Sequence, residues 1–162
     1  MVKVALDEAS IRILDALQED AGLSNSELAE RIGLSTSPCW RRVAELRQQG
    51  VLRSSVALVD AAKLGLMVNV FVHISLANQD KTSLEMFSRE IRERPEIMEC
   101  YLMSGEADFL LRIVIEDLGK YQNLLLECLT QIPGVANIRS SFALSQVKYT
   151  TALPTGHLKA LM

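Results

Sequence analysis

The stretch GLSTSPCWRRVAELRQQGVL, residues 33–52, decides how the amino-terminal part of the chain folds. Residues 33–35 form a short break between two segments with helical apolar spacing. Ser35 is a residue type favoured at helix N-caps. Pro38 would disrupt a helix interior, but it is tolerated in a first turn, where the backbone N–H has no intrahelical partner. The stretch therefore predicts a helix over residues 36–49 that is stopped by the following glycine.

Two helices are expected before this one. Residues 6–17 carry an apolar stripe at helical spacing, which predicts a first helix that ends near Gly22. The stretch SNSELAERIG predicts the second, with Ser24 or Asn25 as its cap and Gly33 as its stop. Residues 51–59, VLRSSVALV, alternate and are rich in valine, which predicts a two-stranded wing. Helix, helix, tight turn, helix and wing, in that order, are typical of a winged helix-turn-helix.

Arginine is concentrated on and around the third predicted helix. The chain has a net charge of −3, yet residues 31–53 hold five arginines and one acidic residue. The first turns of such a helix enter the major groove of DNA. Hydroxyl groups and a helix N-terminus suit phosphate oxygens, and arginine suits both phosphate and the guanine edge. We therefore predict that double-stranded DNA is bound by Ser35, Thr36, Ser37, Pro38, Arg41, Arg42, Arg47 and Arg53.

Adjacent residues on a helix point about 100° apart, so Arg41 and Arg42 cannot face DNA in the same way. We expect one to read a base edge and the other to contact phosphate, while Arg53 contacts the DNA backbone. The alternative is a solvated arginine face. The opposite side of this helix is expected to pack on the first two helices through Cys39, Trp40, Val43 and Leu46. For Trp40 a contact from the indole N–H to phosphate is the alternative.

The apolar pattern changes in the second half of the chain. Strand-like alternation and amphipathic helical spacing follow one another in the order βαββαβ, which predicts a ferredoxin-like domain. The alternation predicts a sheet that buries one face against two helices and exposes the other for pairing between subunits. The predicted fold class is α+β. The domain boundaries are 1–60 for the winged helix-turn-helix, 61–66 for a linker, 67–154 for the ferredoxin-like domain and 155–162 for a tail.

Composition and spacing argue against several other classes. Three cysteines, Cys39, Cys100 and Cys128, match neither a paired disulfide framework nor a CxxC metal site. His73 and His157 belong to no motif with a nucleophile, so neither an enzyme nor a metal site is predicted. No apolar run is long enough for a membrane span and no secretory signal begins the chain, which favours the cytoplasm. A thiol- or metal-responsive regulator using these five side chains remains the alternative, beside a ligand-independent oligomeric DNA-binding protein.

Three motifs together carry a family resemblance: LSTSPCWRRVAELRQQGVL, CYLMSGEADFLLRI and PGVANIRSSFALSQVKYTTALP. Across residues 5–154 the chain resembles the Lrp/AsnC family of bacterial transcriptional regulators, also called feast/famine regulators. The resemblance implies a DNA-binding domain followed by a RAM domain that binds an effector and drives oligomerisation. It also implies a homo-oligomer of dimers, often an octameric ring, that binds an amino acid in clefts between dimers. Transcription would then be regulated by a small effector that changes assembly and DNA binding.

The same resemblance implies where the effector binds. In the family, the turn between the second and third strands of the RAM domain forms much of the cleft, and the last strand contributes to it. The implied residues are Met103, Ser104, Gly105, Glu106, Ala107, Asp108, Ser140 and Ser141. An amino acid needs an acceptor for its ammonium group, and Asp108 offers one unless it bonds its own turn instead. The details resemble the leucine-responsive branch and regulators of amino-acid catabolism, which leaves a branched-chain or other apolar amino acid, or cysteine, as the effector.

Overall fold

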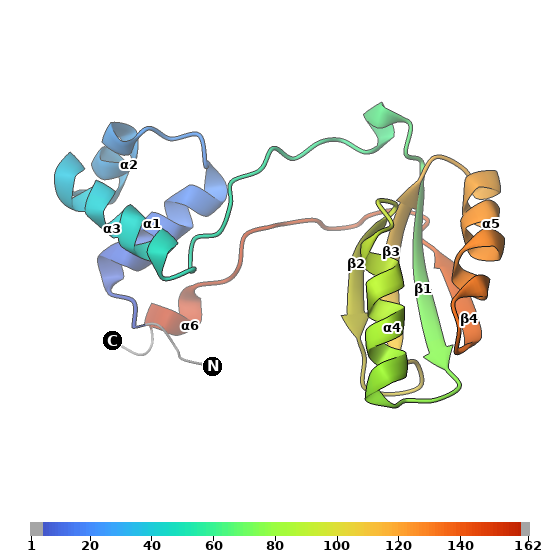
Figure 1. The fold of residues 1–162 in the computed structure, drawn as a ribbon. Helices are drawn as coiled ribbons and strands as arrows, with labels where there is room; N and C mark the ends of the chain where they lie inside the picture. The colour runs from blue at the N-terminus through green and yellow to red at the C-terminus, as the bar shows by residue number, and fades with distance from the viewer. Residues whose placement is uncertain (1–4, 160–162) are drawn as a thin grey trace. The chain divides into compact units, whose positions relative to one another are not determined.

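The structure, a computed structural model, describes residues 5–159 (Figure 1). Its contacts divide the chain into two compact units. One unit comprises the residues up to Ala57 together with those from Lys148 onward, and the other comprises Leu58–Val147. The first is helical and the second is built on a sheet. The sequence had placed the boundaries after residues 60 and 154.

Three helices build the first unit: α1 (Glu8–Glu19), α2 (Asn25–Ile32) and α3 (Thr36–Gln48). Ser24 caps α2 in a reciprocal capping box, and Gly33 ends it at a φ of 69°, so the tight turn before α3 is specified locally. The three helices are those expected from the sequence. Their inward faces form one apolar core of Ile13, Leu14, Ala16, Leu28, Ala29, Ile32, Cys39, Val43 and Leu46.

The predicted wing strands are absent. Residues 53–60 are exposed and contain no strand, and the chain runs through them to the short 3₁₀ helix η1 (Ala62–Leu64) (Figure 1). A two-residue hairpin needs positive φ in its turn. Among the described residues every positive φ belongs to a glycine, and residues 51–59 contain none. The prediction of a two-stranded wing was therefore wrong, although the helix-turn-helix itself is confirmed.

The second unit has the predicted βαββαβ order. Its sheet runs in the order β2-β3-β1-β4, and every neighbouring pair is antiparallel. Two helices, α4 and α5, connect the strands, and the 3₁₀ helix η2 follows α5. The bounds are β1 Val68–Leu76, α4 Lys81–Arg92, β2 Ile97–Leu102, β3 Phe109–Ile115, α5 Leu118–Glu127, η2 Leu129–Gln131 and β4 Val135–Phe142.

Alternation along the strands separates the two faces of this sheet. Every second residue of β1 and β3 is buried against α4 and α5, and the rings of Phe87 and Phe109 lie 4.5 Å apart at the centre of this core. The other face carries Phe71, His73, Tyr101, Leu110 and Arg112, of which Phe71 and Tyr101 are exposed. Both described helices thus cover the same face, as the alternation predicted.

The segment from Lys148 onward, beyond β4, belongs to the first unit. The side-chain amide of Gln18 on α1 accepts from the backbone N–H of Leu153 at 2.7 Å and donates to its carbonyl at 3.2 Å. The Thr155 hydroxyl donates to Asp15 at 2.6 Å, just before the short helix α6 (Gly156–Lys159). Two chain segments, one before β1 and one after β4, therefore join the units. None of the helices in residues 5–159 has the length and apolar content needed to cross a membrane.

Candidate DNA interface and effector site

Helix α3 has two distinct faces. Cys39, Val43 and Leu46 recur at helical spacing and are buried in the three-helix core. Ser37, Trp40, Arg41 and Ala44 recur at i, i+3, i+4 and i+7, and all four are exposed. These four residues are called the exposed stripe below. Because the core fixes the rotation of the helix, the exposed stripe is the face that α3 offers to a partner.

Trp40 lies outside the core in which the sequence analysis placed it. It is 59% exposed, whereas its neighbour Cys39 is fully buried. Cys39, Val43 and Leu46 face α1 and α2, and Trp40 points about 100° away from Cys39 around the helix, outside the face that packs on them. The packing prediction was correct for Cys39, Val43 and Leu46 and wrong for Trp40.

The two adjacent arginines have different surroundings. The Arg41 side chain is 71% exposed and forms a 3.8 Å ion pair with Glu45 on its own helix. Arg42 is 28% exposed and points to the start of α1, where its guanidinium bonds Asp7 and lies 3.5 Å from the Ser10 hydroxyl. Arg42 therefore ties α3 to α1, and Arg41 is the guanidinium that the exposed stripe presents.

Asp7 uses both of its carboxylate oxygens. Oδ1 accepts from the Ser10 backbone N–H at 2.9 Å and so caps α1, while Oδ2 accepts from Arg42. The hydrogen bonds from Ser10, and after them the Arg42 guanidinium, hold the pKa of Asp7 below its ordinary value of 3.8. One side chain thus starts the first helix and orients the third.

The remaining predicted DNA contacts are available at the surface. The hydroxyl residues before and in the first turn of α3 are exposed, and the Ser35 side chain makes no cap hydrogen bond. Pro38 is half-buried in the first turn, as its position predicts. Arg47, in the last turn, and Arg53, beyond the helix, are both exposed.

Asp108, the predicted ammonium acceptor, is buried and bonded to backbone. Its Oδ2 accepts from the N–H of Leu76 at 2.7 Å, and its own N–H donates to Ile74 at 2.8 Å. Its carbonyl accepts from the N–H of Met103 at 2.8 Å, which closes the turn between β2 and β3. Asp108 therefore holds this turn against the end of β1. The sequence analysis had considered two other roles for it, the ammonium acceptor or a residue bonded within its own turn.

The two predicted serines of β4 lie on opposite faces of the sheet. Ser140 pairs with Val72 on the helix side, and its hydroxyl bonds the Tyr121 hydroxyl of α5. Ser141 pairs with Phe71 on the side without helices and is exposed. Residues adjacent in a strand point in opposite directions, so the two hydroxyls face different sides of the sheet.

A pair of opposite charges lies beside the turn instead. Glu106, at the tip of the turn, is 3.8 Å from Arg139 of β4, and both side chains are largely exposed. The Ser75 hydroxyl donates to the Glu106 carbonyl at 3.3 Å. This hydrogen bond places the tip of the turn over the face of the sheet that no helix covers, called the open face below. Gly105 has a φ of 132°, a backbone conformation that glycine tolerates best. The structure thus brings together Gly105, Glu106, Ser75 and Arg139.

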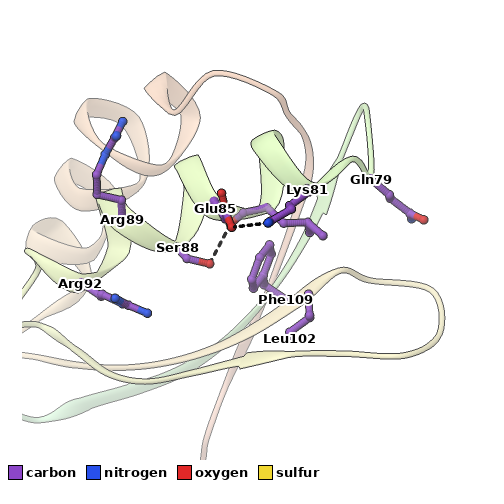
Figure 2. Close-up of a pocket in the computed structure, with 9 residues that line it drawn as sticks. Gln79, Lys81, Glu85, Ser88, Arg89, Arg92, Leu102 and Phe109 are labelled. Atoms are coloured by element: carbon purple, nitrogen blue, oxygen red, sulfur yellow. Dashed lines mark hydrogen bonds and ion pairs between the residues drawn. The ribbon is translucent and has the colours of Figure 1, made fainter.

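An open groove of about 850 Å³ lies on the other side of the turn, between α4 and the ends of β2 and β3 (Figure 2). Leu84, Leu102 and Phe109 form its apolar part, and α4 contributes Lys81, Glu85, Arg89 and Arg92. Lys81 and Glu85 pair with each other at 3.7 Å. No residue of the turn lines this groove, although Leu102 and Phe109 flank the turn on either side.

Comparison with known proteins decides the family. The Lrp/AsnC ligand binding domain matches residues 69–153, and a winged helix-turn-helix DNA-binding domain matches residues 6–53. The Bkd operon transcriptional regulator of Pseudomonas aeruginosa is 41% identical over 149 residues, which cover 92% of this chain and 97% of that protein. The chain belongs to the Lrp/AsnC family. It is a DNA-binding transcriptional regulator with an Lrp/AsnC ligand-binding domain.

Other members of the Lrp/AsnC family agree in sequence and in structure. The DNA-binding transcriptional activator DecR of Escherichia coli is 37% identical over 92% of this chain and 98% of its own length. A transcriptional regulator of Neisseria meningitidis, solved as a complex with L-Met, has a TM-score of 0.90 at 37% identity and covers 94% of this chain and 99% of its own. An AsnC family regulator of Agrobacterium tumefaciens has a TM-score of 0.89 at 41% identity over the same shares.

The cysteines of this Lrp/AsnC regulator are free thiols in different surroundings. Cys39 and Cys128 are buried, which raises the pKa of both thiols, and Cys100 is exposed. Within residues 5–159 no three side chains of the metal-binding types gather at one place. Neither observation favours a thiol- or metal-responsive mechanism.

Sequence reasoning missed the linking roles of Asp7 and Arg139. Asp7 precedes a helix by one residue, which marks it as an N-cap, but its ion pair with a residue 35 positions away has no local signal. Arg139 lies between half-buried β4 neighbours, which places it on the open face, yet its approach to Glu106 depends on the β1–β4 register.

Replacing Asp7 with alanine should destabilise the first unit by about 1 kcal/mol at neutral pH, the usual cost of losing a side-chain N-cap. Because the folded-state pKa of Asp7 is lowered, its contribution is present above its unfolded pKa and is lost as the pH falls through the folded value. Urea unfolding followed by helical circular dichroism should thus separate Asp7→Ala from the parent protein at pH 7. The two should converge once the pH falls below the lowered pKa of Asp7 in the folded protein. Glu8→Ala, at an exposed neighbouring position, is the matched control, and an Asp7→Ala deficit that persisted unchanged in acid would contradict this account.

Proposed function

We propose that this regulator reads double-stranded DNA through the exposed stripe of α3, with Arg41 as its principal base-reading side chain. The observation that carries the proposal is the separation of the two arginines, since Arg41 faces solvent and Arg42 is engaged by Asp7. A free guanidinium in the major groove can donate two hydrogen bonds to guanine O6 and N7. The hydroxyls at the start of α3, together with Arg47 and Arg53, contact phosphates and position the helix.

We further propose that an amino acid binds at the turn between β2 and β3. A zwitterion needs a carboxylate for its ammonium group and donors for its own carboxylate. Glu106 and Arg139 supply both charges within 3.8 Å of each other, and Gly105 allows close approach to the backbone. Asp108 holds the turn in place. The structural relative from Neisseria meningitidis was solved with L-Met, which supports an apolar amino acid as the effector class.

The open face of the sheet is the assembly surface in this proposal. It combines the exposed rings of Phe71 and Tyr101 with a polar network in which Arg112 pairs with Glu99 at 2.8 Å. The buried Nδ1 of His73 has no hydrogen-bond partner among the described residues, and a neighbouring subunit can supply one. We propose that this face forms a dimer, that four dimers form the functional oligomer, and that the protein acts in the cytoplasm without catalysing a reaction.

Arg41→Ala should weaken binding to a preferred duplex by roughly 10- to 100-fold, as expected for loss of one bidentate guanine contact, and should leave the melting temperature unchanged. The preferred duplex is first selected from a random pool with the parent protein. Fluorescence anisotropy against the selected and a scrambled duplex then separates lost specificity from lost charge.

Arg42→Ala is the informative comparison, because it should lower thermal stability as well as DNA affinity by releasing α3 from Asp7. Arg89→Ala, an exposed arginine on α4, controls for loss of one positive charge. Equal affinity of Arg41→Ala and parent protein for the selected duplex would end the assignment of Arg41.

An amino-acid effector should raise the apparent stability of the regulator, since a ligand that binds only the folded state stabilises it by about 2.7 kcal/mol at one hundred times its Kd. A thermal-shift series with each of the common amino acids should give its largest shift with an apolar amino acid such as L-Met or L-Leu. Glu106→Gln and Arg139→Gln should each abolish that shift.

Two control variants distinguish the turn from the rest of the domain. Glu116→Gln removes an exposed carboxylate after β3 and should retain the shift. Arg92→Gln removes a cation from the groove beside α4 and should also retain it. A shift lost in Arg92→Gln but kept in Glu106→Gln would move the site from the turn to the groove.

A further inference from the structure

Trp40 is exposed at a position where the packing of the helices does not require it. Of the large apolar side chains on α1, α2 and α3, all of whose residues the structure describes, Trp40 alone is exposed, at 59%. Single exposed apolar residues are common on protein surfaces and by themselves indicate nothing. The position of Trp40 on α3, within the exposed stripe, is what suggests a role for it.

The indole lies in the middle of the exposed stripe. Ser37 precedes it by three residues and Ala44 follows by four, so both share its side of α3. Arg41 is the next residue along the helix. Ala44 has no side chain beyond Cβ and leaves room beside the indole for a close partner. Trp40 and Arg41 point about 100° apart but both belong to the exposed stripe, so a groove that receives the stripe receives both side chains.

The chemistry of the major groove offers one apolar group to such a side chain. Thymine alone among the standard bases carries a methyl group there, and apolar side chains recognise it by contact. The phosphates that flank the groove attract the neighbouring guanidinium but give an indole face no comparable partner. We propose that Trp40 is a specificity-determining residue that packs its indole on the 5-methyl group of a thymine beside the base pair read by Arg41.

This inference rests on the proposed function, because it requires α3 to enter the major groove. It adds a preference that arginine contacts cannot supply. Arg41 selects guanine, whereas Trp40 selects a thymine next to it, so each half-site should contain a guanine and a thymine at neighbouring positions. In the complex, the thymine methyl group then covers the exposed indole of Trp40 on α3.

The test combines a protein variant with a change of a single methyl group. The probe is the duplex selected from a random pool with the parent protein, and the same duplex with the candidate thymine replaced by deoxyuridine lacks only the 5-methyl group. The parent protein should bind the deoxyuridine duplex about fourfold more weakly, the equivalent of one buried methyl group. Trp40→Ala should bind both duplexes equally, and Trp40→Phe should keep part of the preference.

Trp40 is the single tryptophan of the chain, so intrinsic fluorescence reports on it directly. In the free oligomer its emission should be that of a water-exposed indole, and it should shift to shorter wavelength when the selected duplex is added. Trp40→Ala should leave the melting temperature and the salt dependence of binding unchanged, because an exposed indole supports neither the core nor a phosphate contact. A merely structural role would lower the melting temperature.

The outcomes separate this inference from the function on which it rests. If no sequence is enriched from the pool, the proposed DNA-reading function fails. If a sequence is enriched but the parent protein does not distinguish thymine from deoxyuridine at any position, the assignment of Trp40 fails and DNA reading stands. Emission of a buried indole in the free oligomer, unmoved by DNA, would show that another part of the protein covers Trp40, which also overturns the assignment.

Discussion

Burial of one face of α3 is the constraint on which the rest of the first unit depends. Cys39, Val43 and Leu46 enter a core shared by three helices, and this contact fixes the rotation of the helix about its own axis. The ion pair between Asp7 and Arg42 adds a polar contact at the rim of the same interface. With the rotation fixed, α3 presents the exposed stripe to solvent, and under the proposed function the chemical character of that stripe sets what the regulator can read.

In the second unit, the alternation of side chains along the strands determines which face of the sheet is covered by helices. One face of the sheet is occupied by the packing of α4 and α5, and the opposite face is the one that we propose for assembly. The carboxylate of Asp108 anchors the turn between β2 and β3 to the end of β1. A side chain buried in this way sets the position of its exposed neighbours. Glu106 and Arg139 can therefore lie opposite each other although neither side chain belongs to the core.

Much of this arrangement could be predicted from the sequence because the determining signals are local. Helical spacing, the caps at Ser24 and Gly33, and the alternation of β1 and β3 depend on residues close together in the chain. The errors concern contacts that are not local. Residues 51–59 alternate but form no strands, and the exposure of Trp40 follows from the rotation at which α3 packs on α1 and α2. The role of Asp108 depends equally on a distant partner, the backbone of β1.

The central claim is that the exposed stripe of α3 enters the major groove, and chemical protection of DNA tests it most directly. Dimethyl sulfate methylates guanine N7 in the major groove and adenine N3 in the minor groove. With the parent protein bound to its selected duplex, the account predicts protection of guanine N7 in two patches roughly one helical turn apart, as two reading helices of a dimer require. Protection confined to adenine N3, with guanine N7 fully reactive in the bound complex, would contradict it.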